Sequence, residues 1–144
     1  MMEIYDVAEA LLKSIREENL SFEGKSADSP MQQLWYSPQP VLSQDLEGKI
    51  NFGNPAAFDF FGYRRDEFIG TLSLRLIPDK PELRKTRDEA IKRLLETGIP
   101  EYFDNSPRVR KDGSPIIVPR WVAFRYELRG RYSFGSLILE TGNY

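Results

Sequence analysis

The first 37 residues carry one helical stripe followed by a polar segment. Between residues 3 and 18, apolar side chains recur at the three- and four-residue spacing of one α-helix face. These are Ile4, Val7, Ala8, Leu11, Leu12 and Ile15. Residues 19–30 contain Ser, Gly, Asp and Pro, as is typical of a loop. The pattern predicts a flanking helix and linker over residues 1–37, ahead of one domain over residues 38–144.

Shorter patterns after the linker predict a hairpin and two short helices. Residues 41–45 and 49–53 have the composition of strands, and Gly48 suits the turn between them. Asn54 and Pro55 then supply a helix start, because Asn caps a helix and Pro fits its first position. We expect helices over residues 56–61, ended by Gly62, and over residues 64–70.

A second stripe of helical spacing predicts a longer helix over residues 79–97. Asp79 is a plausible N-cap, Glu82 stands at the capping-box position and Gly98 would end the helix. The expected inward side chains are Leu83, Thr86, Ala90, Ile91, Leu94 and Leu95.

The remaining residues predict three strands, over residues 99–111, 115–127 and 131–141. Asp112-Gly113 and Gly130 mark the turns between them. In the middle strand, alternation places Ile116, Val118, Val122, Phe124 and Tyr126 on one face, and Ile117, Trp121 and Ala123 on the other. Pro115 and Pro119 cannot donate to a ladder, so the beginning of this strand should be irregular.

This order of elements indicates the fold class. Five strands with helices between the second and third give an α+β fold, in which one antiparallel sheet carries helices on one face. The amphipathic N-terminal helix is an addition to that domain.

Four sequence blocks, in this order, resemble the PAS family. They are VLSQDLEGKI at 41–50, NPAA at 54–57, FGY at 61–63 with DEFIG at 66–70, and RKDGS at 110–114. They are similar to the family's D-x-x-G-x-I-x-x-x-N-x-A and G-Y-x-x-x-E-x-I-G patterns and to its late K-D-G-S hairpin. The segments at 73–87 and 98–102 resemble the MEKHLA branch of PAS-like domains.

The resemblance implies a five-stranded sheet cupped around a small interior. Family members hold flavin, heme or small metabolites there, or fill the space with side chains, and they dimerise through the sheet or a flanking helix. This chain has no Cys and no His. A flavin–cysteine photoadduct and a His-ligated heme are therefore not expected, and the cofactor is unknown.

Two interpretations of the interior stay open. Apolar and aromatic residues would line a ligand pocket, or the same side chains would simply fill the core of a ligand-free adaptor. Trp121, Tyr63, Tyr102 and Arg120 or Arg125 are the candidate polar contacts. The full set of candidate pocket residues is Phe58, Phe61, Tyr63, Phe68, Ile69, Leu72, Leu76, Ile91, Leu95, Tyr102, Trp121 and Phe124.

Composition narrows the classes of function. Without Cys and His, the usual zinc sites and the Ser-His-Asp and Cys-His nucleophile systems are excluded. A small enzyme with an aspartate base, drawn from Asp45, Asp59 or Asp104, remains an alternative to a sensor or interaction domain.

The net charge of −2 gives no reason to expect nucleic-acid binding. There is no long apolar run or signal-peptide pattern, so we expect a cytoplasmic protein without a membrane partner.

The N-terminal stripe predicts a homodimer. An isolated helix of this length is marginal in water, so Ile4, Val7, Leu11, Leu12 and Ile15 must be buried somewhere. They would cover their own sheet or pair with the same helix of a second subunit, and two-fold homodimers are the commonest assembly. We expect light scattering to give a dimer mass that Leu11→Asp reduces to that of a monomer. A monomer mass that Leu11→Asp leaves unchanged would exclude the dimer.

Overall fold

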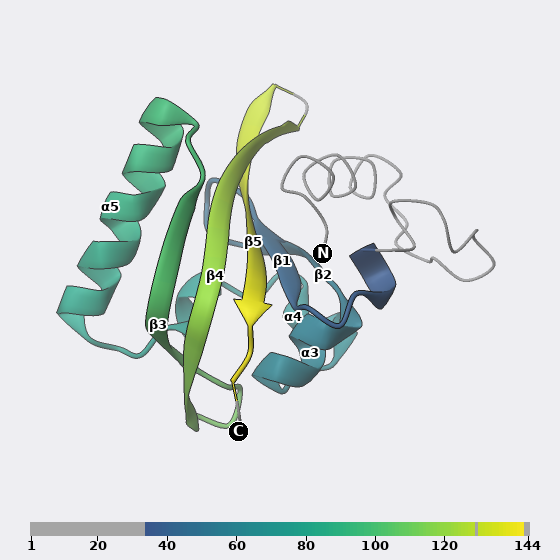
Figure 1. Ribbon diagram of the computed structural model, residues 1–144. Coiled ribbons are helices and arrows are strands. Elements are labelled where there is room, and N and C mark those ends of the chain that lie inside the picture. Colours follow the sequence, from purple (N-terminus) through teal and green to yellow (C-terminus); the bar gives the residue numbers. More distant parts are fainter. Residues whose placement is uncertain (1–33, 129, 143–144) are drawn as a thin grey trace.

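The computed structural model describes residues 34–128 and 130–142, and it contains one sheet with helices inserted between its second and third strands. The strands are β1 (Val41–Gln44), β2 (Ile50–Gly53), β3 (Glu101–Val109), β4 (Pro115–Leu128) and β5 (Arg131–Glu140). They pair antiparallel throughout, in the order β2-β1-β5-β4-β3. Figure 1 shows α3 (Pro55–Phe61) and α4 (Arg65–Phe68) beside β1 and β2, and α5 (Pro81–Thr97) beside β3 and β4. The predicted α+β fold is confirmed, while the N-terminal helix lies outside the described residues.

The first hairpin follows the prediction to within one residue. Between β1 and β2, Asp45 Oδ1 accepts a hydrogen bond from the backbone N–H of Lys49 at 2.9 Å. Gly48 has a φ of 87°, and a Cβ there would stand 3.2 Å from the Arg87 guanidinium. The positive φ favours glycine at this turn, and a larger residue would also press on the end of the Arg87 side chain.

Asn54 joins the hairpin, the short helices and the segment before β1. Its side chain is fully buried. Its Oδ1 accepts from the N–H of Val41 and of Ala57, the second of which caps α3, and both distances are 3.0 Å. Its Nδ2 donates to the carbonyls of Leu34 and Gln39, also at 3.0 Å. The predicted cap is confirmed, and the same amide also braces residues 34–41.

The longer helix begins later than predicted. α5 starts at Pro81, so the N-cap is Lys80, whose side chain makes no capping hydrogen bond. Asp79 is not the cap, because the fixed φ of Pro81 suits the first helical position and sets the boundary. Gly98 ends the helix with a φ of 68°, as predicted. A short 3-10 helix, η1 (Ser73–Leu76), precedes α5 and was not predicted.

β3 and β4 are both irregular at one level of the sheet. Asp104 pairs with Arg120 and Ser106 with Val118, which leaves Asn105 facing Pro119 without a pair. Asn105 has a φ of 52°, and the register between β4 and β5 shifts between Arg120 and Trp121. Pro119 cannot donate a hydrogen bond, which accounts for a defect here.

This defect corrects the predicted faces of β4. Ile116 and Val118 pack in one core cluster with Trp121, so they do not share a face with Val122 and Phe124. The alternation of β4 reverses at the unpaired level of Asn105 and Pro119, whereas the register shift with β5 places its extra residue, Leu139, in β5.

The β3–β4 turn is attached to the short helices. The backbone N–H of Lys111 donates to the carbonyl of Phe61 at 2.9 Å, and the Lys111 ammonium pairs with Glu67 on α4. The RKDGS and FGY blocks, which lie far apart in the sequence, thus contact each other and close one end of the sheet.

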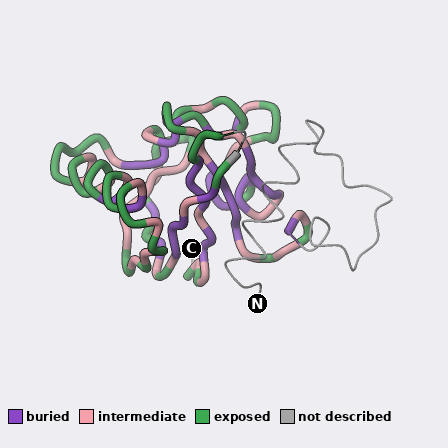
Figure 2. Tube along the Cα trace, turned by 90° about the horizontal axis from the view of Figure 1, so that it is seen from above, coloured by how far each residue is buried: buried purple, intermediate pink, exposed green. Residues whose placement is uncertain are grey.

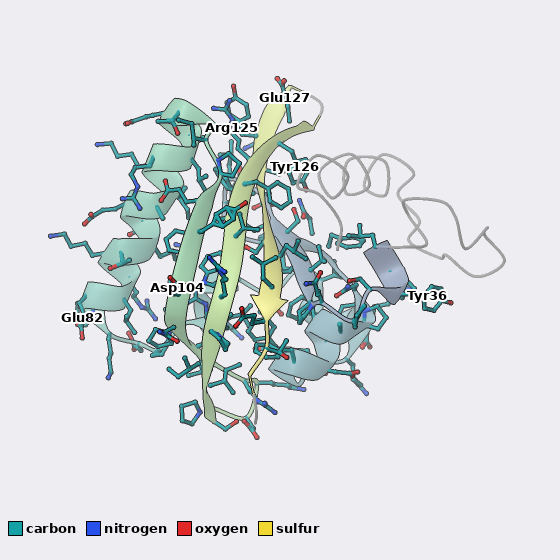
Figure 3. The ribbon with its side chains drawn as sticks, in the orientation of Figure 1. Tyr36, Glu82, Asp104, Arg125, Tyr126 and Glu127 are labelled. Atoms are coloured by element: carbon teal, nitrogen blue, oxygen red, sulfur yellow. The ribbon has the colours of Figure 1, made fainter. Side chains whose placement is uncertain are left out.

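Buried residues occupy the strands and α3, whereas most of α5 is exposed (Figure 2). The main cluster contains Phe58, Phe60, Phe61 and Phe68, with Leu42 and Ile50 from the first hairpin. A smaller cluster joins Leu94 of α5 to Ala123 and Phe134. Arg125 and Tyr126 follow each other near one end of β4, and Tyr36 projects away from the domain (Figure 3). Its exposed fraction is 61%.

The role of Asn54 is testable by substitution. Asn54→Ala removes a cap worth about 1 kcal/mol. It also leaves buried backbone groups without partners, at about 1–3 kcal/mol each. We expect the free energy of unfolding, measured with urea, to fall by at least about 3 kcal/mol.

Asn54→Ser is the matched control, because a hydroxyl can still cap α3 but cannot reach the carbonyls of Leu34 and Gln39. It should recover only the capping part, about 1 kcal/mol. If Asn54→Ala unfolds at the same urea concentration as the unchanged protein, the amide does not brace the domain.

Candidate functional site

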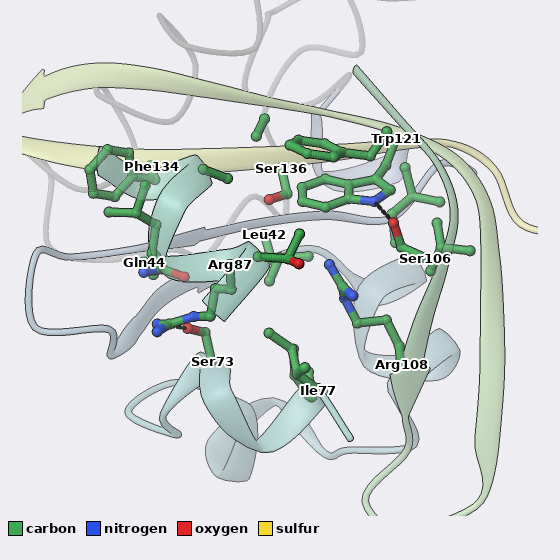
Figure 4. Close-up of a pocket in the computed structure, with 18 of the residues that line it drawn as sticks. Leu42, Gln44, Ser73, Ile77, Arg87, Ser106, Arg108, Trp121, Phe134 and Ser136 are labelled. Atoms are coloured by element: carbon green, nitrogen blue, oxygen red, sulfur yellow. Dashed lines mark hydrogen bonds between the residues drawn. The ribbon is translucent and has the colours of Figure 1, made fainter. Parts of the chain in front are cut away.

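A cavity of about 160 Å³ lies between the sheet and the helices α5 and η1. Its lining comes from β1, β3, β4 and β5 on one side and mainly from η1 and α5 on the other, with Phe61 added from α3 (Figure 4). Most of the exposed surface inside is apolar, from residues such as Leu42, Ile77 and Val118. The polar groups that converge on it are Gln44, Ser73, Thr86, Arg87, Ser106, Arg108 and Ser136.

Two aromatic rings form one wall of the cavity. Phe103 and Trp121 stack with centroids 4.6 Å apart and planes inclined by 22°. The indole N–H of Trp121 donates to Ser106 Oγ at 2.8 Å, which fixes the orientation of the ring. The irregularity at Asn105 and Pro119 allows Phe103, Ser106 and Arg108 all to reach the same space, although strict alternation would send Phe103 and Ser106 to opposite faces.

Arg108 brings a charge into this mainly apolar space. Its guanidinium donates to the carbonyl of Pro107 at 2.6 Å and lies over the Trp121 ring, 5.1 Å from the centroid. Burial, and then repulsion from Arg87, lowers the pKa of Arg108 to about 10. The group is still charged at neutral pH, and no carboxylate among the described residues forms an ion pair with it.

Arg87 reaches the cavity from α5. Its Nη2 donates to Ser73 Oγ at 3.2 Å, and its Nη1 pairs with Asp88 Oδ1 at 3.1 Å. The Arg87 side chain is 21% exposed, whereas that of Asp88 is 69% exposed. The cavity is therefore bordered by two guanidinium groups. Arg87 has a carboxylate partner, Asp88, and that carboxylate lies in solvent.

Four of the candidate pocket residues line the cavity, namely Phe61, Leu76, Ile91 and Trp121. Phe58, Phe68 and Phe124 are buried outside it, and Tyr63 packs on Phe68. Leu95 packs against the smaller core cluster. Ile69, Leu72 and Tyr102 are 36%, 42% and 57% exposed. Tyr102 points away because its neighbour Phe103 takes the inward position on β3.

Of the remaining candidate polar contacts, one lies in the cavity wall and two lie outside it. Trp121 lines the cavity, whereas Arg120 pairs with the exposed Asp104 across β3 and β4 at 3.8 Å. Arg125 donates to the carbonyl of Leu95 at 2.9 Å and holds the end of α5. Sequence reasoning missed Arg87 and Arg108. The helical spacing of Arg87 from Leu83 and Ala90 indicates that Arg87 shares their inward face. No such signal exists for Arg108, because the faces of β3 reverse at Asn105.

The residues of the alternative enzyme hypothesis lie elsewhere. Asp45, Asp59 and Asp104 do not line the cavity. Within residues 34–128 and 130–142, no group of His, Cys, Asp and Glu side chains is placed to hold a metal ion. The cavity thus presents cations and hydroxyls, which suit binding of a polar group, and none of its described lining residues carries a carboxylate.

A family model, the MEKHLA domain, matches residues 7–126. The chain belongs to the MEKHLA family. No curated protein matches its sequence. For the part that the structure describes, no helix of this MEKHLA domain is long and apolar enough to cross a bilayer.

Solved PAS domains share the fold of this MEKHLA domain. The PAS domain of an HTR-like protein from Haloarcula marismortui is 20% identical with a TM-score of 0.57, over 73% of this chain and 88% of that one. The PAS domain of nitrogen regulation protein NR(II) from Vibrio parahaemolyticus is 16% identical with a TM-score of 0.61, over 75% and 94%. A PAS domain in complex with ethanol, from a LuxR-family transcriptional regulator of Burkholderia thailandensis, is 13% identical with a TM-score of 0.59, over 73% and 91%. The chain therefore has the PAS fold.

The left-handed conformation of Asn105 gives a prediction about the cavity wall. A β-branched residue is strained at a φ of 52°, and the cost is about 1–2 kcal/mol, whereas glycine adopts it freely. We expect Asn105→Val to lower the free energy of unfolding by that amount and Asn105→Gly to change it by less than about 0.5 kcal/mol. Chemical denaturation measures both. Equal stability of the Val and Gly variants would mean that the wall does not depend on this conformation.

Proposed function

We propose that this domain is a sensor that binds a small molecule in the cavity between the sheet and α5 and passes its occupancy to a protein partner or a second subunit. The observation that carries the proposal is the cavity itself, which is mainly apolar and has several polar groups directed into it. Small-molecule sites commonly have this composition. A ligand-free adaptor would have no need of such a space, because protein interiors are close-packed.

The size of the cavity favours a small metabolite over a large cofactor. Pockets for drug-sized ligands have about 300–1,000 Å³. A cavity of about 160 Å³ is closer to the engineered apolar cavity of roughly 150 Å³ that binds benzene. A flavin or a heme is much larger than such a ligand.

Occupancy would be transmitted through the surfaces that border the cavity. Any ligand there contacts α5 and the central strands β4 and β5 together, so filling the cavity changes how the helix rests on the sheet. Tyr102 and Ile117 on β3 and β4 are 57% and 54% exposed, so they would be available for contact with a partner. The N-terminal stripe offers the second route, by dimerisation.

Native mass spectrometry of freshly purified protein tests ligand binding. We expect a small non-covalent adduct in the unchanged protein. Ala123→Leu, which adds side-chain volume to a buried position of the cavity wall, should remove the adduct. An absorption spectrum of the same sample reports any chromophore.

The matched control is Ala56→Leu, the same change on α3 outside the cavity, which should keep the adduct. If Ala123→Leu does not fold, Ser136→Leu fills the same space from β5. A protein with no co-purifying mass, whose thermal stability no small molecule raises, would favour the adaptor and contradict the proposal.

A further inference from the structure

The charges around the cavity do not balance. Arg87 is paired with Asp88, while Arg108 has no carboxylate partner among the described residues. Within the described lining there is no Asp or Glu side chain. The two guanidinium groups therefore leave an excess of positive charge at the cavity.

The Arg108 side chain is partly buried, and an unpaired guanidinium held largely out of water is costly unless something compensates for it. Its hydrogen bond to the Pro107 carbonyl and its position over the Trp121 ring satisfy part of this need. Neither contact neutralises the charge. Desolvation and repulsion from Arg87 lower the pKa of Arg108 to about 10, as expected for a cation held without a counter-ion.

The two cations and the serine hydroxyl between α5 and η1 suit an anionic group. In Figure 4 the Arg87 and Arg108 side chains lie on either side of the space, and the Arg87 guanidinium is turned toward Ser73, to which it donates. Guanidinium groups bind carboxylates with two parallel hydrogen bonds, and serine hydroxyls can donate to the same oxygens.

The remainder of the cavity suits an apolar body. Phe61, Leu76 and Ile138 line it, and the stacked pair of Phe103 and Trp121 presents aromatic surface to it. A volume of about 160 Å³ admits a ring or a short branched chain with one polar group.

We infer that the ligand of this domain is a small monocarboxylate, whose anionic end lies between Arg108 and Arg87 and whose apolar body packs against Trp121. The inference rests on the proposed function, because it presumes that the cavity binds a small molecule. The apolar remainder of the cavity offers no further cation among its described lining residues, so a second carboxylate would be buried without a partner, which selects a monoanion.

Titration calorimetry on the full chain with three probes tests this inference. Benzoate and benzamide have nearly the same shape and differ in charge, and succinate is a dianion of similar size. We expect benzoate to bind at least tenfold more tightly than benzamide and than succinate.

Arg108→Met identifies the residue responsible. Methionine keeps an apolar stem against Trp121, so the variant should fold with an unchanged or higher melting temperature. We expect it to weaken benzoate binding at least tenfold and to change benzamide binding by less than threefold. Arg75→Met, at an exposed arginine of η1, is the matched control and should leave both affinities unchanged.

The outcomes separate the two proposals. If benzamide binds as tightly as benzoate to the unchanged protein, the cavity binds small molecules but the inference of an anion is wrong. If no probe binds and no mass co-purifies, both proposals fail. The comparison of probes needs no variant, so it decides the question even where Arg108→Met does not fold.

Discussion

The single constraint on which the cavity depends is the meeting of Asn105 and Pro119 across β3 and β4. Proline cannot complete the ladder, and Asn105 adopts a positive φ opposite it. Both strands reverse their alternation at this level. Phe103 and Trp121 therefore face the helices on one side of the defect, and Arg108 and Ile116 face them on the other. An unbroken pair of strands would send Arg108 to the opposite face, and the cavity would have no cation from the sheet.

The sequence blocks that resemble the PAS family mainly stabilise the fold and contribute few residues to the cavity wall. Asn54 closes α3 and holds residues 34–41, and the turn after β3 is fastened to Phe61 and Glu67. These contacts fix the ends of the sheet and leave its middle, where the cavity lies, to other residues. Their presence therefore identifies the fold and says little about what the domain binds.

Local rules were enough to predict most of the fold. Turn glycines, the Asn-Pro helix start and the five strands are encoded by neighbouring residues, so they could be recognised one segment at a time. The site was only partly predictable. Phe61, Leu76, Ile91 and Trp121 follow from apolar periodicity. Arg108 does not, because its direction depends on the unpaired level that Asn105 forms with Pro119 of a second strand. A charged residue on an edge strand would ordinarily be assigned to the surface.

The attachment of α5 is unequal along its length. Near its C-terminal end, Arg125 donates to the Leu95 carbonyl and Arg93 forms a two-pronged ion pair with Glu101, with N···O distances of 2.8 and 3.0 Å. Toward the N-terminal end, its described hydrogen bond to another element is the one from Arg87 to Ser73. The C-terminal end of α5, close to Gly98, is thus held more firmly than its N-terminal end. A molecule that draws the Arg87 guanidinium away from Ser73 would release the N-terminal end of the helix from η1, while the C-terminal end stayed attached to the sheet.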